Sequence, residues 1–165
     1  MLNLAVGDVV VYGAHGAGIV AAREMRSVNG DDQAVVVIAL AGGLSVQLPL
    51  ALAQAQLRAL VDETGIATIR KVLRDSPPVS RDSWLKRSRA AQGKLGDAIG
   101  LAEVVRDGSV RDAASLRGSG SRLAPSEREL VRRARALLTA EIALARDVPV
   151  GDAEAWVDRQ LAPSR

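Results

Sequence analysis

Residues 7–20 read GDVVVYGAHGAGIV, and they set the pattern for the first part of the chain. The β-branched residues before the glycines are typical of a strand. Glycine supplies backbone angles that other residues rarely adopt, so the segment GAHGAG predicts a tight connection to a second strand. His15, the only histidine of the chain, lies within that connection. We therefore interpret His15 as a turn residue rather than a catalytic base.

The next residues repeat the pattern of short apolar runs separated by turn signals. Asn29-Gly30 stands between two such runs and favours a type I′ hairpin, because both central residues of that turn need a positive φ. Gly42-Gly43 and the run LSVQLP (44–49) follow. Four or five short strands are too few for a sandwich. They predict a small, curved SH3-like or Tudor-like barrel.

After residue 64 the apolar residues recur with the helical period. The segment TGIATIRKVLRD places Ile66, Ile69, Val72 and Leu73 on one face, and SWLKRSRAAQGKL and DAIGLAEVVRD continue the helical pattern. Breaks are expected at 75–81, where two prolines forbid a helix, and at the loop RGSGSR, 117–122.

The strongest helix signal is APSERELVRRARALLTAEIALARD, 124–147. It predicts a start at Pro125 with a capping box of Ser126 and Glu129. The expected buried stripe consists of Leu130, Ala134, Leu137, Leu138 and Ile142. A last short helix near DAEAWVDRQL is expected to pack back through Trp156 and Leu161. Together these patterns predict an α+β protein with two domains, a small β-barrel at 1–60 and a compact all-α domain at 61–165.

Composition excludes several classes of chemistry. The 165 residues include no cysteine and one histidine, which rules out disulfides and thiolate nucleophiles and argues against zinc. The most apolar run, AVVVIAL at 34–40, is too short to span a bilayer, and the N-terminus does not resemble a signal peptide. We expect a cytoplasmic protein that needs no metal or cofactor and does not engage a membrane.

The charge is distributed unevenly along the chain. Residues 1–65 carry three arginines against six acidic residues, whereas the remaining hundred carry 19 basic residues against 13 acidic ones. A basic half beside an acidic half indicates two modules with different partners, and the basic one has the charge of a nucleic-acid binder. A solvated helical surface with no such partner accounts equally well for charge alone.

Five motifs in a fixed order resemble the CarD/CdnL family of bacterial RNA polymerase-binding transcription regulators. They are VGDVVVYGAHGAGIV, LSVQLP, SWLKRSR, LAEVVRD and LTAEIALA, and the resemblance covers about residues 4–147. It implies a Tudor-like domain that binds the β subunit of RNA polymerase, followed by a helical domain on promoter DNA. The N-terminal module also resembles that of the transcription-repair coupling factor.

The resemblance implies a mechanism without enzymatic activity. In the family a tryptophan enters the minor groove at the upstream edge of the melted bubble, and basic residues hold it there through phosphates without reading sequence. Trp84 is the matching residue here, with Lys86 and Arg89 at backbone-contacting positions and Arg87 as a plausible third contact. Tryptophans are buried on average, but the polar and basic neighbours of Trp84 indicate exposure, and Trp156 is the better core candidate.

The resemblance also implies a docking strand. LSVQLP would add to an edge of the polymerase β subunit, and we expect docking through Arg26, Val37, Gln47 and Pro49. Gln47 departs from the arginine or apolar residue that family members have there. Gly108 stands where leucine is common, Ser88 stands where an aromatic residue is frequent, and the loop at 113–122 is longer than usual. We expect the protein to act as a monomer.

Three other readings come from different classes. HGAG faintly resembles a lipase oxyanion loop, but no G-x-S-x-G motif accompanies it, so an enzyme is disfavoured. A free-standing DNA-binding or nucleoid-associated protein would use the basic half alone. A polymerase-binding module that recruits something other than promoter DNA would not depend on Trp84.

Overall fold

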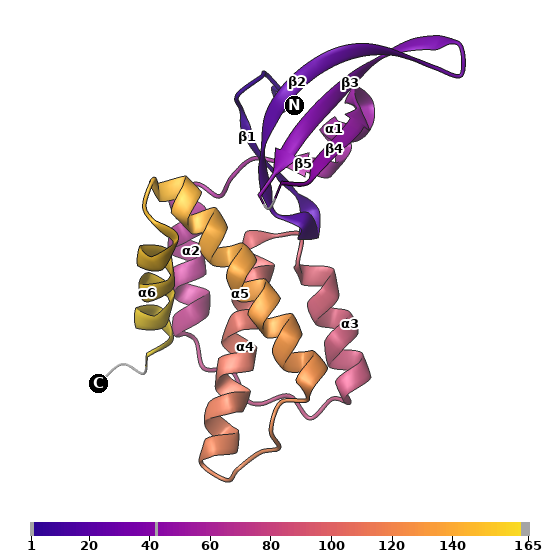
Figure 1. Ribbon diagram of the computed structural model, residues 1–165. Coiled ribbons are helices and arrows are strands. Elements are labelled where there is room, and N and C mark those ends of the chain that lie inside the picture. The colour runs from indigo at the N-terminus through magenta and orange to yellow at the C-terminus, as the bar shows by residue number, and fades with distance from the viewer. Residues whose placement is uncertain (1, 42, 163–165) are drawn as a thin grey trace. The chain divides into compact units, whose positions relative to one another are not determined.

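The computed structural model describes residues 2–41 and 43–162. The chain divides into two compact units, one ending at Leu60 and the other beginning at Val61. The first unit is a five-stranded antiparallel sheet and the second is helical (Figure 1). The α+β prediction, with a Tudor-like β part before a helical part, is confirmed.

The sheet of the first unit has the strand order β4-β3-β2-β1-β5. Its strands are β1 (Val9–Tyr12), β2 (Ala17–Val28), β3 (Asp31–Leu40), β4 (Ser45–Pro49) and β5 (Leu57–Arg58). A short 3-10 turn, Gly13–His15, joins β1 to β2, and a helix that the sequence did not suggest, α1 (Leu50–Gln56), joins β4 to β5. GAHGAG is thus the connection that its glycines predicted.

Two turns and one glycine explain the shape of this sheet. Asn29 and Gly30 have φ values of 56° and 90°, which confirms the predicted turn between β2 and β3. Beyond Val20, β2 pairs only with β3, so the two strands form a long arm (Figure 1). Gly18 lies where a Cβ atom would stand 2.7 Å from the carbonyl oxygen of Ala39, so a side chain there would collide with backbone.

The inner face of the sheet forms the core of the first unit. Alternate residues of β3 and β4 point inward, as the two-residue period of a strand requires. The buried residues are Leu4, Val10, Val20, Val36, Ile38, Leu40, Leu48, Ala53 and Leu57. No phenylalanine or tryptophan takes part, so small aliphatic side chains fill this core.

The described part of the second unit, residues 61–162, contains five helices. They are α2 (Glu63–Arg74), α3 (Trp84–Lys94), α4 (Ala98–Leu116), α5 (Pro125–Arg146) and α6 (Val150–Leu161). Both predicted breaks lie between helices. Ile66, Ile69 and Leu73 of α2 are buried, and Val72 is half-buried. Gly108 lets α4 approach α5 closely, since a Cβ atom there would stand 2.7 Å from Val131.

The longest helix shows one wrong prediction. Ser126 does not cap α5, because the N-cap is Ala124, two residues earlier, and this residue makes no side-chain cap bond. Pro125 fixes the first helical φ without needing a cap. Glu129 instead pairs with Arg132, and this hydrogen bond lowers the pKa of the Glu129 carboxyl.

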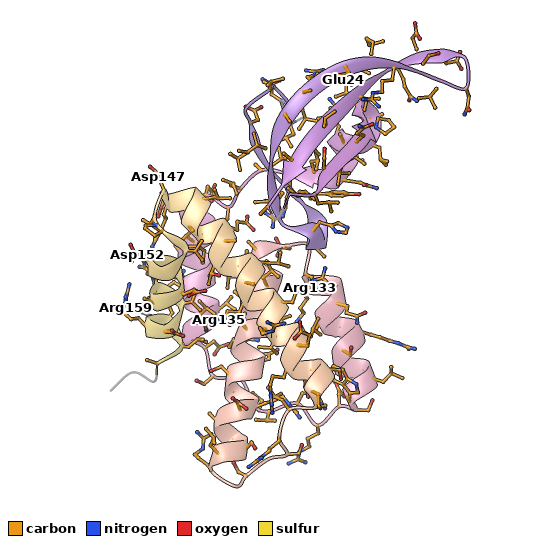
Figure 2. All side chains as sticks on the ribbon, in the orientation of Figure 1. Glu24, Arg133, Arg135, Asp147, Asp152 and Arg159 are labelled. Carbon is orange, nitrogen blue, oxygen red and sulfur yellow. The ribbon has the colours of Figure 1, made fainter. Side chains whose placement is uncertain are left out.

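The predicted apolar stripe of α5 lies on the inner side of the helix. Ala134, Leu138 and Ile142 are buried, while Leu130 and Leu137 are half-buried. On α6, Trp156 and Val157 are buried and Leu161 is half-buried, whereas Asp152 and Arg159 are exposed on the outer side (Figure 2). Within residues 2–41 and 43–162, no helix is long and apolar enough to cross a membrane.

Candidate nucleic-acid interface and docking edge

Helix α3 presents Trp84 at its first turn. Ser83 is the N-cap, and its hydroxyl oxygen accepts a hydrogen bond from the backbone N–H of Lys86, 3.4 Å away. The preceding Pro77-Pro78 segment is not helical, so the helix starts where the sequence allows it. No residue of α3 is buried. Trp84 is half-buried and the neighbouring Leu85 is 59% exposed.

Two of the predicted DNA-binding cations are accessible to solvent. The Lys86 ammonium lies 3.1 Å from Asp82 in a pair whose lysine side chain is 73% exposed. An exposed ion pair of this kind contributes little to the stability of the fold, so the lysine can still bind a phosphate group. Arg89 is exposed one turn from Leu85. Both cations therefore lie close in sequence to the exposed start of α3.

The third predicted cation, Arg87, has a different environment. Its Nε lies 3.1 Å from Glu127 Oε1 on α5, and its Nη1 donates to the carbonyl oxygen of Asp82. Arg111 on α4 approaches the same carboxylate, with Nε 3.3 Å from Oε1. Glu127 is buried, and sequence reasoning missed it because its partners are distant along the chain. Arg87 thus holds α3 against α5, and its phosphate contact stays a prediction.

A cavity of about 270 Å³ lies beside this ion trio, between α3, α4, α5 and the segment 77–82. Trp84, Arg87, Arg111 and Glu127 all line it. Most of its wall is apolar, and it includes the two prolines of the 75–81 break. The half-buried state of Trp84 comes from its place on this wall, which the sequence did not reveal.

The four predicted docking residues lie on one face of the sheet. Val37 is paired with Gln47 across β3 and β4, and Val35 is paired with Pro49. Residues paired across antiparallel strands point to the same side of a sheet. Arg26 reaches this side from β2, because its Nη1 donates to Gln47 Oε1 at 2.7 Å. The structure therefore brings together residues that are up to 23 positions apart.

Glu24 completes this surface and was not predicted. Its carboxylate accepts hydrogen bonds from Nε and Nη2 of Arg26 at 3.0 and 2.8 Å. Figure 2 labels Glu24 on the arm formed by β2 and β3. Two acceptors, Glu24 and Gln47, thus fix one exposed guanidinium. The polar side chain at 47 is the second of these acceptors.

Strand β4 has the geometry that strand addition requires. It is at one end of the sheet and pairs only with β3 among the described strands. Its outward residues Ser45 and Gln47 are exposed, whereas Leu48 is buried. A free strand edge offers main-chain N–H and C=O groups to another strand. The predicted docking strand therefore has an open edge and an accessible outer face.

His15 lies in the 3-10 turn between β1 and β2. The imidazole is exposed and stacks on Tyr12 with ring centroids 4.9 Å apart. Residues 2–41 and 43–162 hold no group of three or more His, Cys, Asp or Glu side chains that could bind a metal. His15 is thus part of the turn that connects β1 with β2.

Family models match almost the whole chain. The model described as CarD-like/TRCF RID domain matches residues 4–61, and the model described as CarD, C-terminal domain matches residues 68–158. The second match alone covers more than half of the chain. The chain belongs to the CarD family. The resemblance inferred from the five motifs is confirmed.

Membership of the CarD family indicates the general function of this protein. This CarD family member is a transcription regulator that interacts with RNA polymerase, in a family that is regulatory rather than enzymatic. The RID domain is of the type that binds the polymerase β subunit, and it covers the sheet that carries Arg26, Val37, Gln47 and Pro49. The C-terminal match covers α3, with Trp84, Lys86, Arg87 and Arg89.

Proposed function

We propose that this CarD family member stabilises the promoter open complex by placing Trp84 in the minor groove at the upstream edge of the bubble. The observation that carries the proposal is the start of α3, where Trp84 and the 59% exposed Leu85 precede two solvent-accessible cations. Apolar side chains inserted at a base step offset the cost of unstacking and favour the opened DNA. Lys86 and Arg89 would hold the wedge through phosphates, largely independently of sequence.

The sheet would supply the second contact. Arg26, Val37, Gln47 and Pro49 form the docking surface on the polymerase β subunit, with β4 adding to an exposed strand of that subunit. The fixed Arg26 guanidinium suits a carboxylate on the partner, because a charge-assisted bond gains strength when its donor is already oriented. Binding to polymerase would then raise the local concentration of Trp84 at the promoter.

The test is the lifetime of preformed open complexes after addition of a DNA competitor, with and without the protein. We expect a longer lifetime at saturating protein and no requirement for a particular promoter sequence at the contact. An unchanged lifetime, in complexes shown to contain the protein, would overturn the proposal. The net effect on transcription follows separately, since a longer-lived open complex can also slow promoter escape.

A free-standing DNA-binding or nucleoid-associated protein is the second candidate, favoured by the basic balance of the residues after 65. Affinity for promoter DNA, measured with and without polymerase at the same salt concentration, separates the two. The first proposal predicts weak binding to free DNA and much tighter binding with polymerase. Equal affinities in both settings would favour the second candidate.

A further inference from the structure

We infer that the cavity beside Trp84 is a binding site for a small organic anion, with one carboxylate-like head group on an apolar body. The site lies wholly within the helical unit, among residues 77–131. Binding there would need neither DNA nor polymerase. The inference therefore goes beyond the proposed function and can be tested on the isolated protein.

The walls of the cavity fit an apolar ligand body. Its apolar lining includes Val104 and Gly108 of α4, Leu130 and Val131 of α5 and the prolines at 77 and 78. The volume of the cavity is about 270 Å³. Concave, mostly apolar sites with a few convergent polar groups are typical of small-molecule binding.

The charges of the cavity select an anion. The half-buried side chain of Arg87 and the buried side chain of Arg111 share one carboxylate, that of Glu127, so this trio carries one uncompensated positive charge. The other cations of the wall are paired with acidic residues: Lys86 with Asp82, Lys94 with Glu103, and Arg106 with Asp107 and the exposed Asp75. Because an unpaired charge is costly away from water, a bound anion at the trio would be stabilised.

Arg111 has the donors for that anion. Its side chain is only 10% exposed, and its Nε is the one buried side-chain nitrogen or oxygen of the described residues without a hydrogen-bond partner, although Glu127 lies 3.3 Å away as an ion pair. Its Nη1 makes a long bond of 3.4 Å to the carbonyl oxygen of Ser80. A guanidinium carries five N–H groups, so donors remain for a carboxylate.

A ligand in this cavity would also touch the indole of Trp84, which forms part of the wall. If the proposed function holds, a bound ligand would keep the indole of Trp84 at the wall of the cavity rather than in the DNA. The lifetime of the open complex would then be shorter. That consequence rests on the proposed function, whereas binding itself does not. The two can therefore fail separately.

The probes are benzoate, benzyl alcohol and benzylamine, which share one apolar body and carry an anionic, a neutral and a cationic head. Each is titrated into the Trp156→Phe protein, where the indole N–H signal in an NMR spectrum comes from Trp84 alone. We expect benzoate to shift that signal in a saturable way at millimolar concentration, and the other two to bind at least tenfold more weakly. Equal binding of the three probes, or none, would overturn the inference.

Three variants of the Trp156→Phe protein test the site. Arg111→Gln should weaken benzoate binding at least tenfold, because a charge-assisted contact is lost. Arg81→Gln, which removes an exposed arginine outside the cavity, should leave binding unchanged. Ala91→Leu, which adds volume at the wall without altering the ion trio, should abolish it. Unaltered binding in both Arg111→Gln and Ala91→Leu would place the probe elsewhere and contradict the inference.

Discussion

The two tryptophans of this protein occupy opposite kinds of environment within the same helical unit. Trp156 on α6 is 9% exposed, and the guanidinium carbons of Arg146 and Arg70 lie 5.0 and 5.9 Å from its ring centroid. Trp84 is half-buried at the first turn of α3, a helix without a buried residue. The ring of Trp156 is thus packed in the core beside two cations, whereas the ring of Trp84 lies on the wall of a cavity.

This difference follows from the neighbours of each residue. Trp156 belongs to a helix whose inner face includes Ala153 and Val157, both fully buried, so the ring completes an apolar layer. Trp84 follows a proline break and precedes Leu85 and Lys86, and its helix is attached through the pair of Arg87 with Glu127. An aromatic ring that contributes little to a core is available for another contact.

The largest effect is expected for Trp156→Ala. Removal of a buried tryptophan ring leaves a cavity and should lower the free energy of unfolding by about 3–5 kcal/mol. Chemical denaturation followed by circular dichroism measures the change. A loss below about 1 kcal/mol would show that Trp156 is not the core residue of the pair.

Glu127→Gln should have the next largest effect. The substitution keeps the shape of the side chain but leaves the half-buried Arg87 and the buried Arg111 without a counter-charge, so we expect a loss of about 3 kcal/mol in the free energy of unfolding. Glu129→Gln, on the exposed side of the same helix, is the matched control and should unfold like the wild type. Equal stability of both variants would mean that the ion trio does not hold α3 in place.

Trp84→Ala should change stability by no more than about 1 kcal/mol, because the ring is half-buried at the border of an existing cavity. The comparison with Trp156→Ala in the same denaturation experiment is the sharpest form of this test. A loss as large as that of Trp156→Ala would identify Trp84 as a core residue, and the contrast between the rings would disappear.

A small effect, on binding rather than on stability, is expected for Gln47→Ala, which touches neither tryptophan. Loss of the hydrogen bond to Arg26 should weaken binding to the polymerase β subunit by about 0.5–1.5 kcal/mol, chiefly through faster dissociation. Surface-immobilised β subunit measures the rate, and Ser45→Ala on the same strand serves as the control. If neither Gln47→Ala nor Arg26→Glu alters dissociation, the docking surface lies elsewhere on the sheet.

Local patterns in the sequence predicted most of the fold. The Asn29-Gly30 turn and the helical period of Ile66, Ile69 and Leu73 are properties of neighbouring residues, so they can be read without a structure. The family motifs located Trp84 and the docking strand in the same way. The short helix α1 was missed, because LALAQAQ has no N-cap signal and follows a strand directly.

The remaining features of the candidate sites depend on contacts between distant residues. Arg87 donates a hydrogen bond to Glu127, which lies 40 positions later in the sequence, and Arg26 donates one to Gln47, 21 positions later. Neither pair leaves a periodic signal, so the sequence could not reveal that Arg87 is held by a carboxylate. The cavity beside Trp84 depends on the packing of three helices. The expected capping box of Ser126 failed because Pro125 starts α5 by itself.

The most direct test of the account compares the two tryptophans in open-complex lifetime. Polymerase and promoter are saturated with wild-type protein, Trp84→Ala or Trp156→Phe, and the decay of open complexes is followed after competitor is added. Loss of a stacking contact of about 1–3 kcal/mol should shorten the protein-dependent lifetime about 5- to 150-fold for Trp84→Ala. Trp156→Phe should retain the wild-type lifetime. A full lifetime with Trp84→Ala, in complexes shown to contain the variant, would contradict the claim that Trp84 supports the open DNA.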